Sequence, residues 1–138
     1  MPLPPLQDIL DEYEFLDGED RYRLLIDLGK QLDLMPDALK TDATKVRGCS
    51  ASVWVYPTVD GDRLHFLADS NAAITKGIVA LILSAVQDKP AAEVARLDIN
   101  TALAPFELKK HLSANRTQGV PNMIALIRET AERYAAAA

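Results

Sequence analysis

The feature that most constrains this chain is its most hydrophobic run, residues 78–86, which reads Ile-Val-Ala-Leu-Ile-Leu-Ser-Ala-Val. Apolar residues at spacings of three and four predict one long helix over 72–87, preceded by the N-cap residue types Asp69-Ser70-Asn71. A helix that is apolar on nearly every side is normally buried against a sheet. The run is too short to cross a bilayer, which needs about 20 apolar residues. It therefore predicts a central helix packed on a β-sheet.

Helical periodicity continues on both sides of this run. Before it, residues 5–16 and 19–32 predict two antiparallel helices joined by a tight turn. After it, we expect helices over 91–95 and 101–111 and a final helix that begins near residue 117 or 118, or at residue 113 with a kink. Pro121 distinguishes these two starts, because proline is tolerated in the first turn of a helix and kinks a helix interior.

Two strands are predicted between the helical hairpin and the central helix. Residues 53–56 are rich in β-forming types, and residues 63–68 return after the turn signal Asp60-Gly61-Asp62. Pro57 either ends the first strand or places it at a sheet edge, and a third short strand is expected at 45–48. The order of elements predicts a single α+β domain of 138 residues, a small antiparallel three-stranded sheet with helices packed on it.

The charge balance restricts the classes of partner. The chain has 15 basic and 20 acidic residues, a net charge of −5 at pH 7. Nucleic-acid binding relies on basic residues that neutralise phosphates, so nucleic acid is not an expected partner. The N-terminus lacks the basic and apolar regions of a secretory signal, no membrane is expected, and one cysteine cannot form an internal disulfide. These features favour a cytoplasmic protein.

The only cysteine, Cys49, lies in a run of small residues directly before the first predicted strand. A lone cysteine is most often a buried apolar side chain, and composition alone favours that interpretation. Three local features favour an accessible thiol: Cys49 is not on an apolar periodic face, Gly48 and Ser50 favour a turn, and Lys45 and Arg47 would stabilise a thiolate. The residues alone leave both interpretations open.

Other site chemistry finds little support in the residue types present. A cysteine hydrolase needs a base, and the two histidines, His65 and His111, fall in a predicted strand and at a predicted helix end without a signature context. Zinc and iron–sulfur sites need several Cys or His ligands, and thioredoxin chemistry needs a CxxC pair. Taken alone, Arg116 is a solvated surface residue and Trp54 a packing residue. The acids within 11–20 are expected on exposed helix faces, where they could also dock a basic partner.

Four segments spread along the chain share their order and spacing with one protein family. They are Arg21-Tyr22 with Leu28-Gly29, then Val46-Arg47-Gly48-Cys49 with Ser52-Val53-Trp54, then Asp69-Ser70-Asn71-Ala72-Ala73-Ile74-Thr75-Lys76-Gly77, and finally Leu112-Ser113 with Arg116, Gly119 and Met123. Together they resemble the SufE/CsdE family of sulfur-acceptor proteins, and the resemblance covers nearly the whole chain. One departure follows the cysteine, where the family commonly has Gln-Ser and this chain has Ser50-Ala51. Pro121 in the last helix is a second departure.

The resemblance implies a fold shared with iron–sulfur scaffold proteins of the IscU type. The scaffold function does not carry over, because the additional cysteine ligands are missing. It also implies a function: the protein takes persulfide sulfur from a PLP-dependent cysteine desulfurase of the SufS or CsdA type, stimulates that enzyme, and passes the sulfur to iron–sulfur cluster assembly, for example to the SufBCD complex. PLP belongs to the desulfurase in this scheme, and no cofactor or metal is expected in this chain, which is not itself an enzyme.

Site residues follow from the same resemblance. Cys49 is the expected persulfide acceptor, in a loop with Gly48 and Ser50, and Arg116 is a candidate stabiliser of the thiolate or persulfide. We expect Cys49 to be at least partly sheltered in the free protein, because a carried persulfide needs protection. Small residues on both sides of Cys49 would let the loop move out on docking.

Two further residues and two alternative functions complete the expectations. Asp69 and Lys76, at the start of the central helix, are candidates for the partner surface, or they only stabilise the helix. The first alternative function is a non-catalytic adaptor that regulates a desulfurase by binding alone. The second is an iron–sulfur scaffold relative, which the ligand count disfavours.

Overall fold

The centre of the fold is an antiparallel β-hairpin. A computed structural model describes residues 3–48, 51–111 and 119–137. Strands β1 (Val53–Asp60) and β2 (Arg63–Ser70) pair along their whole length, and Gly61 turns the chain between them with a φ of +64° that suits glycine. The short β3 (Lys89–Pro90) pairs with the other side of β2, so the strand order is β1-β2-β3. The predicted α+β class is confirmed.

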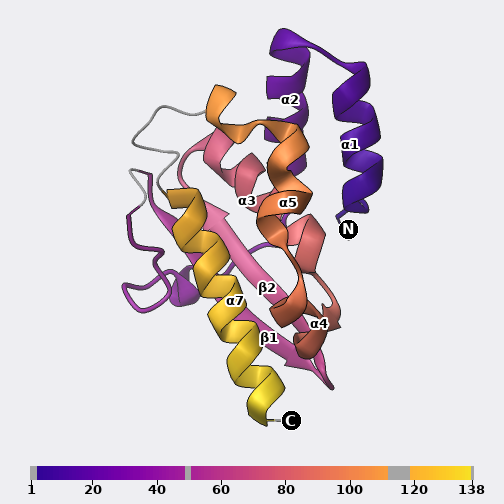
Figure 1. Cartoon of the computed structure of the whole chain (residues 1–138). Coiled ribbons are helices and arrows are strands. Elements are labelled where there is room, and N and C mark those ends of the chain that lie inside the picture. Colours follow the sequence, from indigo (N-terminus) through magenta and orange to yellow (C-terminus); the bar gives the residue numbers. More distant parts are fainter. Residues whose placement is uncertain (1–2, 49–50, 112–118, 138) are drawn as a thin grey trace.

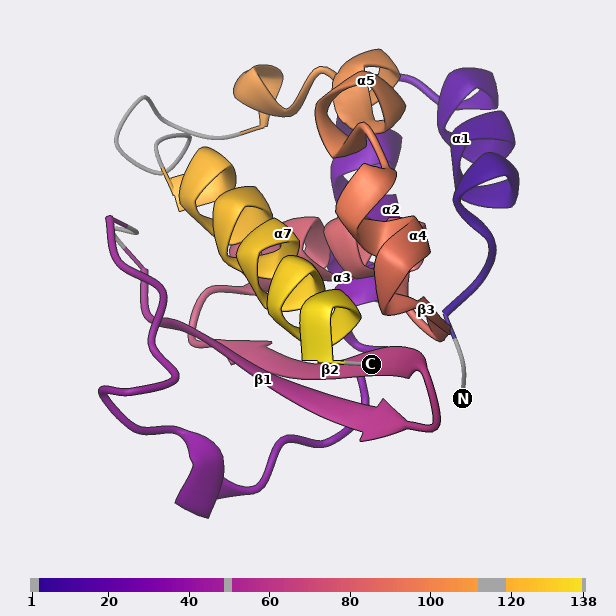
Figure 2. The ribbon, with the colours of Figure 1, turned by 60° about the horizontal axis from the view of Figure 1, so that its bottom comes forward.

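The helices lie on one face of this sheet, with α3 (Ala73–Val86) at the centre (Figures 1 and 2). Residues of α3 are buried on nearly every side, because the sheet covers one side and other helices cover the rest. Alternate β2 residues, Leu64, Phe66 and Ala68, point into the same core. The helices around α3 are α1 (Leu6–Phe15), α2 (Gly18–Gly29), α4 (Ala91–Arg96), α5 (Ile99–Leu103) and α7 (Gly119–Ala137).

Helices α2 and α3 pack with their backbones in close approach. A Cβ atom on Gly29 would lie 2.7 Å from the backbone nitrogen of Gly77, and a Cβ on Gly77 would collide with the backbone oxygen of Leu25. Because these neighbours are backbone atoms, they cannot move aside as a flexible side chain would. Each glycine therefore lets one helix pass directly over the other.

The outer face of the sheet is covered by the chain between α2 and β1. This segment, residues 30–46, contains the one-turn helix η1 (Asp37–Leu39) and lies on the side of β1 and β2 opposite α3 and α7 (Figure 2). The partly buried β2 residues His65, Leu67 and Asp69 alternate with the core residues and so face this segment. The sequence of residues 33–44 predicts a loop that could contain one helical turn, and it does not indicate that this loop covers the sheet.

The third strand differs from the predicted one. Only Lys45 of the expected strand at 45–48 pairs with the sheet among the described residues, through an isolated bridge to Trp54. Two residues later Gly48 takes a φ of +81°, which no strand residue adopts, so pairing ends there. Pro57 does lie in an edge strand, as one of the two predicted alternatives requires, at a position where a backbone N–H would point away from β2.

The helix expected over 101–111 is also shorter than predicted. Helix α5 ends at Leu103, and two single turns follow, η2 (Ala104–Phe106) and η3 (Leu108–Lys110). Pro105 lacks a backbone N–H, and Glu107 takes a left-handed φ of +49°, so a continuous helix is not possible here. Within the described residues the final helix, α7, starts at Gly119, which places Pro121 in its first turn, as the first of the two predicted alternatives requires. Within the described ranges, no helix is long and apolar enough to span a membrane.

Candidate functional site

The loop that contains Cys49 has a fixed base. Cys49 and Ser50 lie outside the described residues, as does Arg116 in the 112–118 segment. On the described flanks, the backbone N–H of Val46 donates to the carbonyl of Val53 over 2.8 Å, beside the Lys45–Trp54 bridge. The chain therefore leaves the sheet after Val46 and returns to it at Val53. The cysteine is carried between two anchored points at the start of β1.

The flank after the cysteine is held by Asn71. The backbone N–H of Ser52 donates to Oδ1 of Asn71 over 3.1 Å, and the backbone N–H of Asn71 donates to the Ser52 carbonyl over 3.2 Å. The sequence suggested Asn71 as a helix cap, but α3 begins after Ala72 without a side-chain cap hydrogen bond. Asn71 instead fixes the returning strand of the loop to the junction of β2 and α3.

The flank before the cysteine is held from a different element. The side-chain amide of Asn122, in the first turn of α7, donates from Nδ2 to the carbonyl of Arg47 over 2.8 Å. The Arg47 side chain itself is exposed. No sequence signal identified Asn122, because the contact joins residues that are 75 positions apart.

Asp69 and Lys76, both predicted for the partner surface, are brought together at the base of the loop. Lys40 Nζ lies 2.7 Å from Asp69 Oδ2, and Lys76 Nζ lies 3.1 Å from Asp69 Oδ1. Lys40 also lies over the ring of Trp54, 5.8 Å from its centroid. We call Asp69, Lys40 and Lys76 the Asp69 cluster. Sequence reasoning missed Lys40, because it belongs to the segment that crosses the outer face.

The cluster favours an ionised Asp69. Burial raises the pKa of this carboxyl, but the hydrogen bonds from Lys40, the Ser70 backbone N–H and Lys76 outweigh burial and hold the pKa below its usual value. The hydrogen bond to Asp69 likewise raises the pKa of Lys40. Lys40 Nζ also lies 3.2 Å from Oδ1 of the exposed Asp37, so the two ammonium groups are balanced by two carboxylates and no surplus charge remains.

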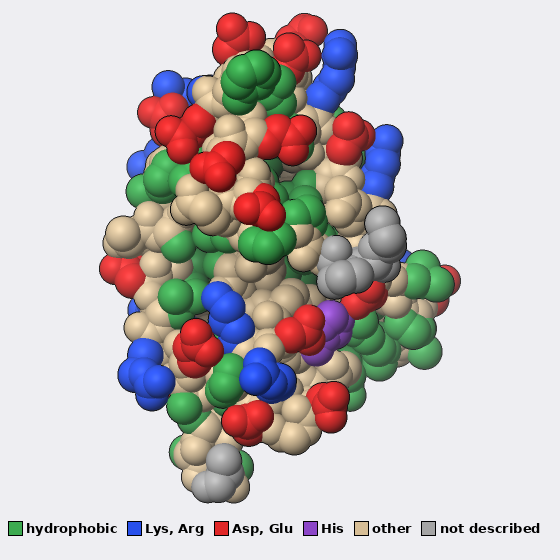
Figure 3. All heavy atoms as spheres, turned by 90° about the vertical axis from the view of Figure 1, so that its right-hand side faces the viewer, with side chains coloured by type: hydrophobic (Ala, Val, Ile, Leu, Met, Phe, Trp, Pro, Cys, Tyr) green, Lys and Arg blue, Asp and Glu red, His purple; other side chains and the backbone are tan. Residues whose placement is uncertain are grey.

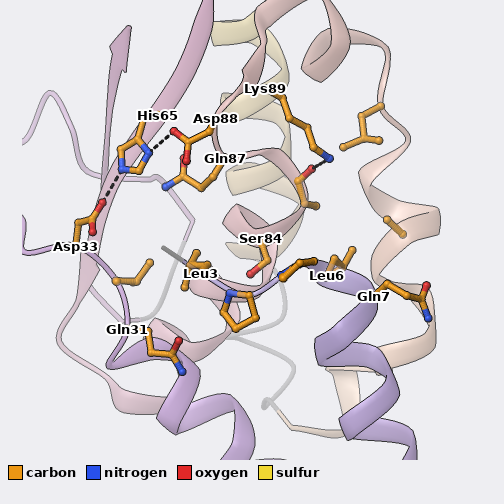
Figure 4. Close-up of a pocket in the computed structure, with 16 residues that line it drawn as sticks. Leu3, Leu6, Gln7, Gln31, Asp33, His65, Ser84, Gln87, Asp88 and Lys89 are labelled. Carbon is orange, nitrogen blue, oxygen red and sulfur yellow. Dashed lines mark hydrogen bonds and ion pairs between the residues drawn. The ribbon is translucent and has the colours of Figure 1, made fainter. Parts of the chain in front are cut away.

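A second cluster lies at the opposite end of β2. His65 Nε2 lies 2.6 Å from Asp33 Oδ2, and His65 Nδ1 lies 2.8 Å from Asp88 Oδ1 (Figure 4). Burial lowers the pKa of His65, but the hydrogen bonds to Asp33 and Asp88 outweigh it, so the pKa is raised above 6.5. We call these three residues the His65 cluster. They border a pocket of about 440 Å³ between the chain before α1 and the end of α3.

Both histidines make polar contacts with other side chains of the described residues. Both ring nitrogens of His65 already bond carboxylates. His111 Nε2 contacts the hydroxyl of Tyr13, which itself donates to the carbonyl of Phe106, and burial together with Arg21 lowers the pKa of His111. The two carboxylates at His65 contact different nitrogens of its ring, Asp33 at Nε2 and Asp88 at Nδ1.

Over residues 3–48, 51–111 and 119–137, no group of three His, Cys, Asp or Glu side chains could hold a metal ion.

The acidic surface predicted for the first two helices is present. Figure 3 shows acidic side chains gathered at the end of the molecule that α1 and α2 form. Arg23 makes exposed ion pairs with Glu19 and Asp20, at 3.8 and 3.9 Å. Pairs this exposed contribute little to stability. The exposed acids between residues 11 and 20 are Asp11, Glu12, Glu14, Asp17, Glu19 and Asp20.

Comparison with known sequences places the chain in the SufE family, and comparison with solved structures finds a similar fold. The family model for SufE, described as an Fe-S metabolism associated domain, matches residues 7–131. A SufE-like protein of Rhizobium etli, named as uncharacterized, is 39% identical over 137 residues, which cover 96% of this chain and 93% of the relative. The sulfur acceptor protein CsdE of Escherichia coli is 43% identical over 106 residues, which cover 74% of this chain and 70% of CsdE.

The solved structures include a similar fold. The solution structure of a hypothetical protein from Thermus thermophilus matches with a TM-score of 0.78 and covers 99% of each chain. The two sequences are 15% identical, so this likeness supports the fold alone.

Proposed function

Because the chain belongs to the SufE family, by the match over residues 7–131 and the 43% identity to CsdE, we propose that it is a sulfur-acceptor protein whose reactive group is the thiol of Cys49. The family match is the observation that carries this proposal. It spans the position of the only cysteine in the chain. A sulfur acceptor needs one nucleophilic thiol, and Cys49 is the residue that can supply it.

The proposed step is an exchange between two cysteines. The Cys49 thiolate attacks the outer sulfur of a persulfide on the active-site cysteine of a desulfurase. A new S–S bond forms at Cys49, the S–S bond of the desulfurase breaks, and the desulfurase cysteine leaves as a thiolate. The step involves no net oxidation or reduction, so it requires no cofactor in this chain. Pyridoxal phosphate belongs to the desulfurase, where the first persulfide is made.

The surroundings of the loop support an anionic sulfur. The exposed Arg47 precedes Cys49 by two residues, and the exposed Lys45 precedes it by four. Positive charge favours the thiolate over the thiol and so raises the fraction of the nucleophile present at neutral pH. We keep Arg116 as a candidate contact of the persulfide, on the strength of the family motif.

The partner and the destination of the sulfur form the finer part of the proposal. We expect a cysteine desulfurase of the SufS or CsdA type to turn over faster in the presence of this protein, because removal of its persulfide regenerates its free thiolate. We expect the sulfur to pass to iron–sulfur cluster assembly in the cytoplasm, with a SufBCD-type scaffold as the recipient. The description of the matched domain, Fe-S metabolism associated, supports iron–sulfur cluster assembly as the destination of the sulfur.

Desulfurase turnover separates a carrier from an adaptor. Consumption of cysteine by a desulfurase is measured against increasing concentrations of wild type and of Cys49→Ser. A carrier requires the thiol, so Cys49→Ser should give no stimulation while still binding the enzyme. Wild-type protein with its thiol alkylated serves as a control and should behave like Cys49→Ser. Stimulation by Cys49→Ser equal to that of wild type would reject the carrier and leave the adaptor.

A further inference from the structure

The pocket beside the His65 cluster has a wall that is largely apolar. It measures about 440 Å³ and lies where the chain before α1, the residues after α2, β2 and the end of α3 meet (Figure 4). Ligand pockets in proteins commonly measure about 300–1,000 Å³, so this one has room for a small molecule. Four leucines of its wall, Leu3, Leu6, Leu32 and Leu97, are only partly buried. An apolar ligand group would remove these side chains from water, which favours binding.

One end of the pocket can accept hydrogen bonds from a ligand. Asp33 and Asp88 each use one carboxylate oxygen for His65, at 2.6 and 2.8 Å. An ionised carboxylate has two oxygens and about four acceptor sites. Each aspartate can therefore bind His65 and still accept from a positively charged group in the pocket.

Asp88 is placed at this end against two local preferences. It takes a left-handed φ of +59° just past the C-terminus of α3, a position where glycine is usual. A carboxylate there also faces the negative end of the helix dipole. Positions that break such local preferences are often functional. The residue type at position 88 thus favours the presence of a carboxylate over an easy helix ending.

Lys89 gives the pocket a positive group away from the aspartates. Its Nζ donates to the carbonyl of Ala85 over 2.8 Å, which uses one of the three N–H groups of the ammonium. Figure 4 shows the His65 cluster and Lys89 Nζ on opposite sides of Gln87. With the imidazole protonated, the two aspartates, the imidazole and Lys89 carry no net charge. The pocket therefore has a negative end and a positive end, and it favours neither a simple cation nor a simple anion.

We propose that this pocket binds a small zwitterion with an apolar body, the class that includes free apolar amino acids and short apolar peptides. The ammonium of the ligand lies at Asp33 and Asp88, its carboxylate lies at Lys89, and its apolar groups contact the leucines of the wall. Each charge of the ligand then meets an opposite charge, and charge-assisted hydrogen bonds of this kind are the strong ones. This binding goes beyond sulfur transfer and does not depend on it.

Ligand analogues test the two charges without altering the fold. Isotope-labelled protein is titrated with L-leucine and with L-leucyl-L-leucine, which distinguish a free amino acid from a peptide, and its backbone amides are followed by NMR. Each ligand is also tested as its N-acetyl derivative, which lacks the ammonium, and as its amide, which lacks the carboxylate. We expect saturable shifts at Asp33, His65, Asp88 and Lys89. Each blocked form should bind about tenfold more weakly, the scale of one charge-assisted hydrogen bond.

A variant tests the positive end of the site. Lys89→Met keeps most of the aliphatic stem and should weaken the unblocked ligand about tenfold. It should leave the affinity for the amide form unchanged, because that form has no carboxylate for Lys89 to bind. Lys30→Met, at an exposed lysine, is the matched control and should bind as the wild type does. Cys49→Ser should also bind normally, whatever its effect on sulfur transfer.

Three results would overturn the proposal. The first is the lack of any saturable shift at about 10 mM of either ligand, well above a Kd in the millimolar range. The second is equal affinity for the blocked and unblocked forms, which would mean that the charges do not contribute. The third is an affinity for the unblocked ligand that Lys89→Met leaves unchanged.

Discussion

The two ends of β2 carry charged clusters of different balance on the same outer face. The Asp69 cluster joins one carboxylate to two lysines, and the ion pair between Lys40 and Asp37 brings its net charge to zero. The His65 cluster joins one imidazole to two carboxylates and has a surplus negative charge when the imidazole is protonated. Each cluster includes a residue of the 30–46 segment, Lys40 in the first and Asp33 in the second. Both clusters therefore fasten the same segment across the sheet.

The two clusters differ in the net charge that each carries. A cluster of either balance can hold the segment on the sheet, so this structural role does not determine the charge at the loop end. The loop end has no surplus negative charge, and the proposed chemistry places a thiolate and then a persulfide there. The surplus negative charge lies at the other end of β2, beside a pocket to which no step of the proposed reaction refers. The balanced cluster at the loop end is therefore compatible with an anionic sulfur.

The largest effect is expected when the Asp69 cluster loses its carboxylate. Asp69→Asn keeps the shape of the side chain but removes the carboxylate that pairs with Lys76 and leaves Lys40 with Asp37 alone, at a site where the Asp69 side chain is 18% exposed. We expect the free energy of unfolding to fall by about 2 kcal/mol, as for other hydrogen bonds to charged groups. Urea denaturation at neutral pH measures it. Asp42→Asn, at an exposed acid of the same segment, loses the same charge and is the control; a loss no larger than the control's contradicts the prediction.

A smaller effect with a distinct pH dependence is expected at the His65 cluster. The pKa of His65 is raised above 6.5 in the folded protein, because the carboxylates outweigh burial. Its contribution to stability is therefore fully present below pH 6.5 and is lost as the pH rises through the folded pKa. We expect His65→Gln to cost about 1 kcal/mol near pH 6 and less near pH 9, since the cluster is partly exposed. An equal cost at both pH values would mean that the charged imidazole does not fasten the segment.

The Asp69 cluster should respond to pH in the opposite sense. The pKa of Asp69 is held below its usual 3.8, so its contribution is present above pH 3.8 and is lost as the pH falls through the lower folded pKa. The cost of Asp69→Asn should therefore be constant between about pH 6 and about pH 9, where the cost of His65→Gln declines. The same urea series, repeated at each pH, measures both variants.

The smallest effect concerns the partner. Lys76→Gln removes one positive charge from the loop end, and we expect the concentration for half-maximal desulfurase stimulation to rise about threefold, the usual scale for one partly exposed charge. Lys30→Gln removes the same charge from an exposed residue directly after α2. It should leave this concentration unchanged. Equal effects of the two variants would mean that the loop end has no special role in docking.

The sequence predicted the parts of the fold that depend on local pattern. The apolar run identified α3, and the Asp-Gly-Asp signal located the hairpin turn at Gly61. Short pairings were not predictable in this way. β3 is two residues long, and it forms because the chain after α3 places Lys89 and Pro90 beside β2. The expected strand at 45–48 failed for a related reason, because a contact with α7 and the φ of Gly48 override the local β preference.

The candidate site was predictable to the extent that a family motif covers it. The motif made Cys49 a candidate, whereas composition favoured a buried side chain, and the positions of Cys49 and Arg116 fall outside the described residues. Asp69 and Lys76 became candidates in the same way, but their pairing with each other was not predicted. Lys40, Asn71 and Asn122 were missed as site residues. Their roles arise from contacts between distant segments, and nothing in the local sequence of an exposed lysine or asparagine predicts such contacts.

The central claim, that Cys49 accepts sulfur, is tested most directly by intact mass. The protein is incubated with a cysteine desulfurase and free cysteine, its mass is measured without reductant, and the modified peptide is mapped. We predict that the wild type gains the mass of one sulfur atom on the peptide that contains Cys49, and that Cys49→Ser gains none. A wild type without added sulfur, or a Cys49→Ser variant that still gains it, would contradict the account.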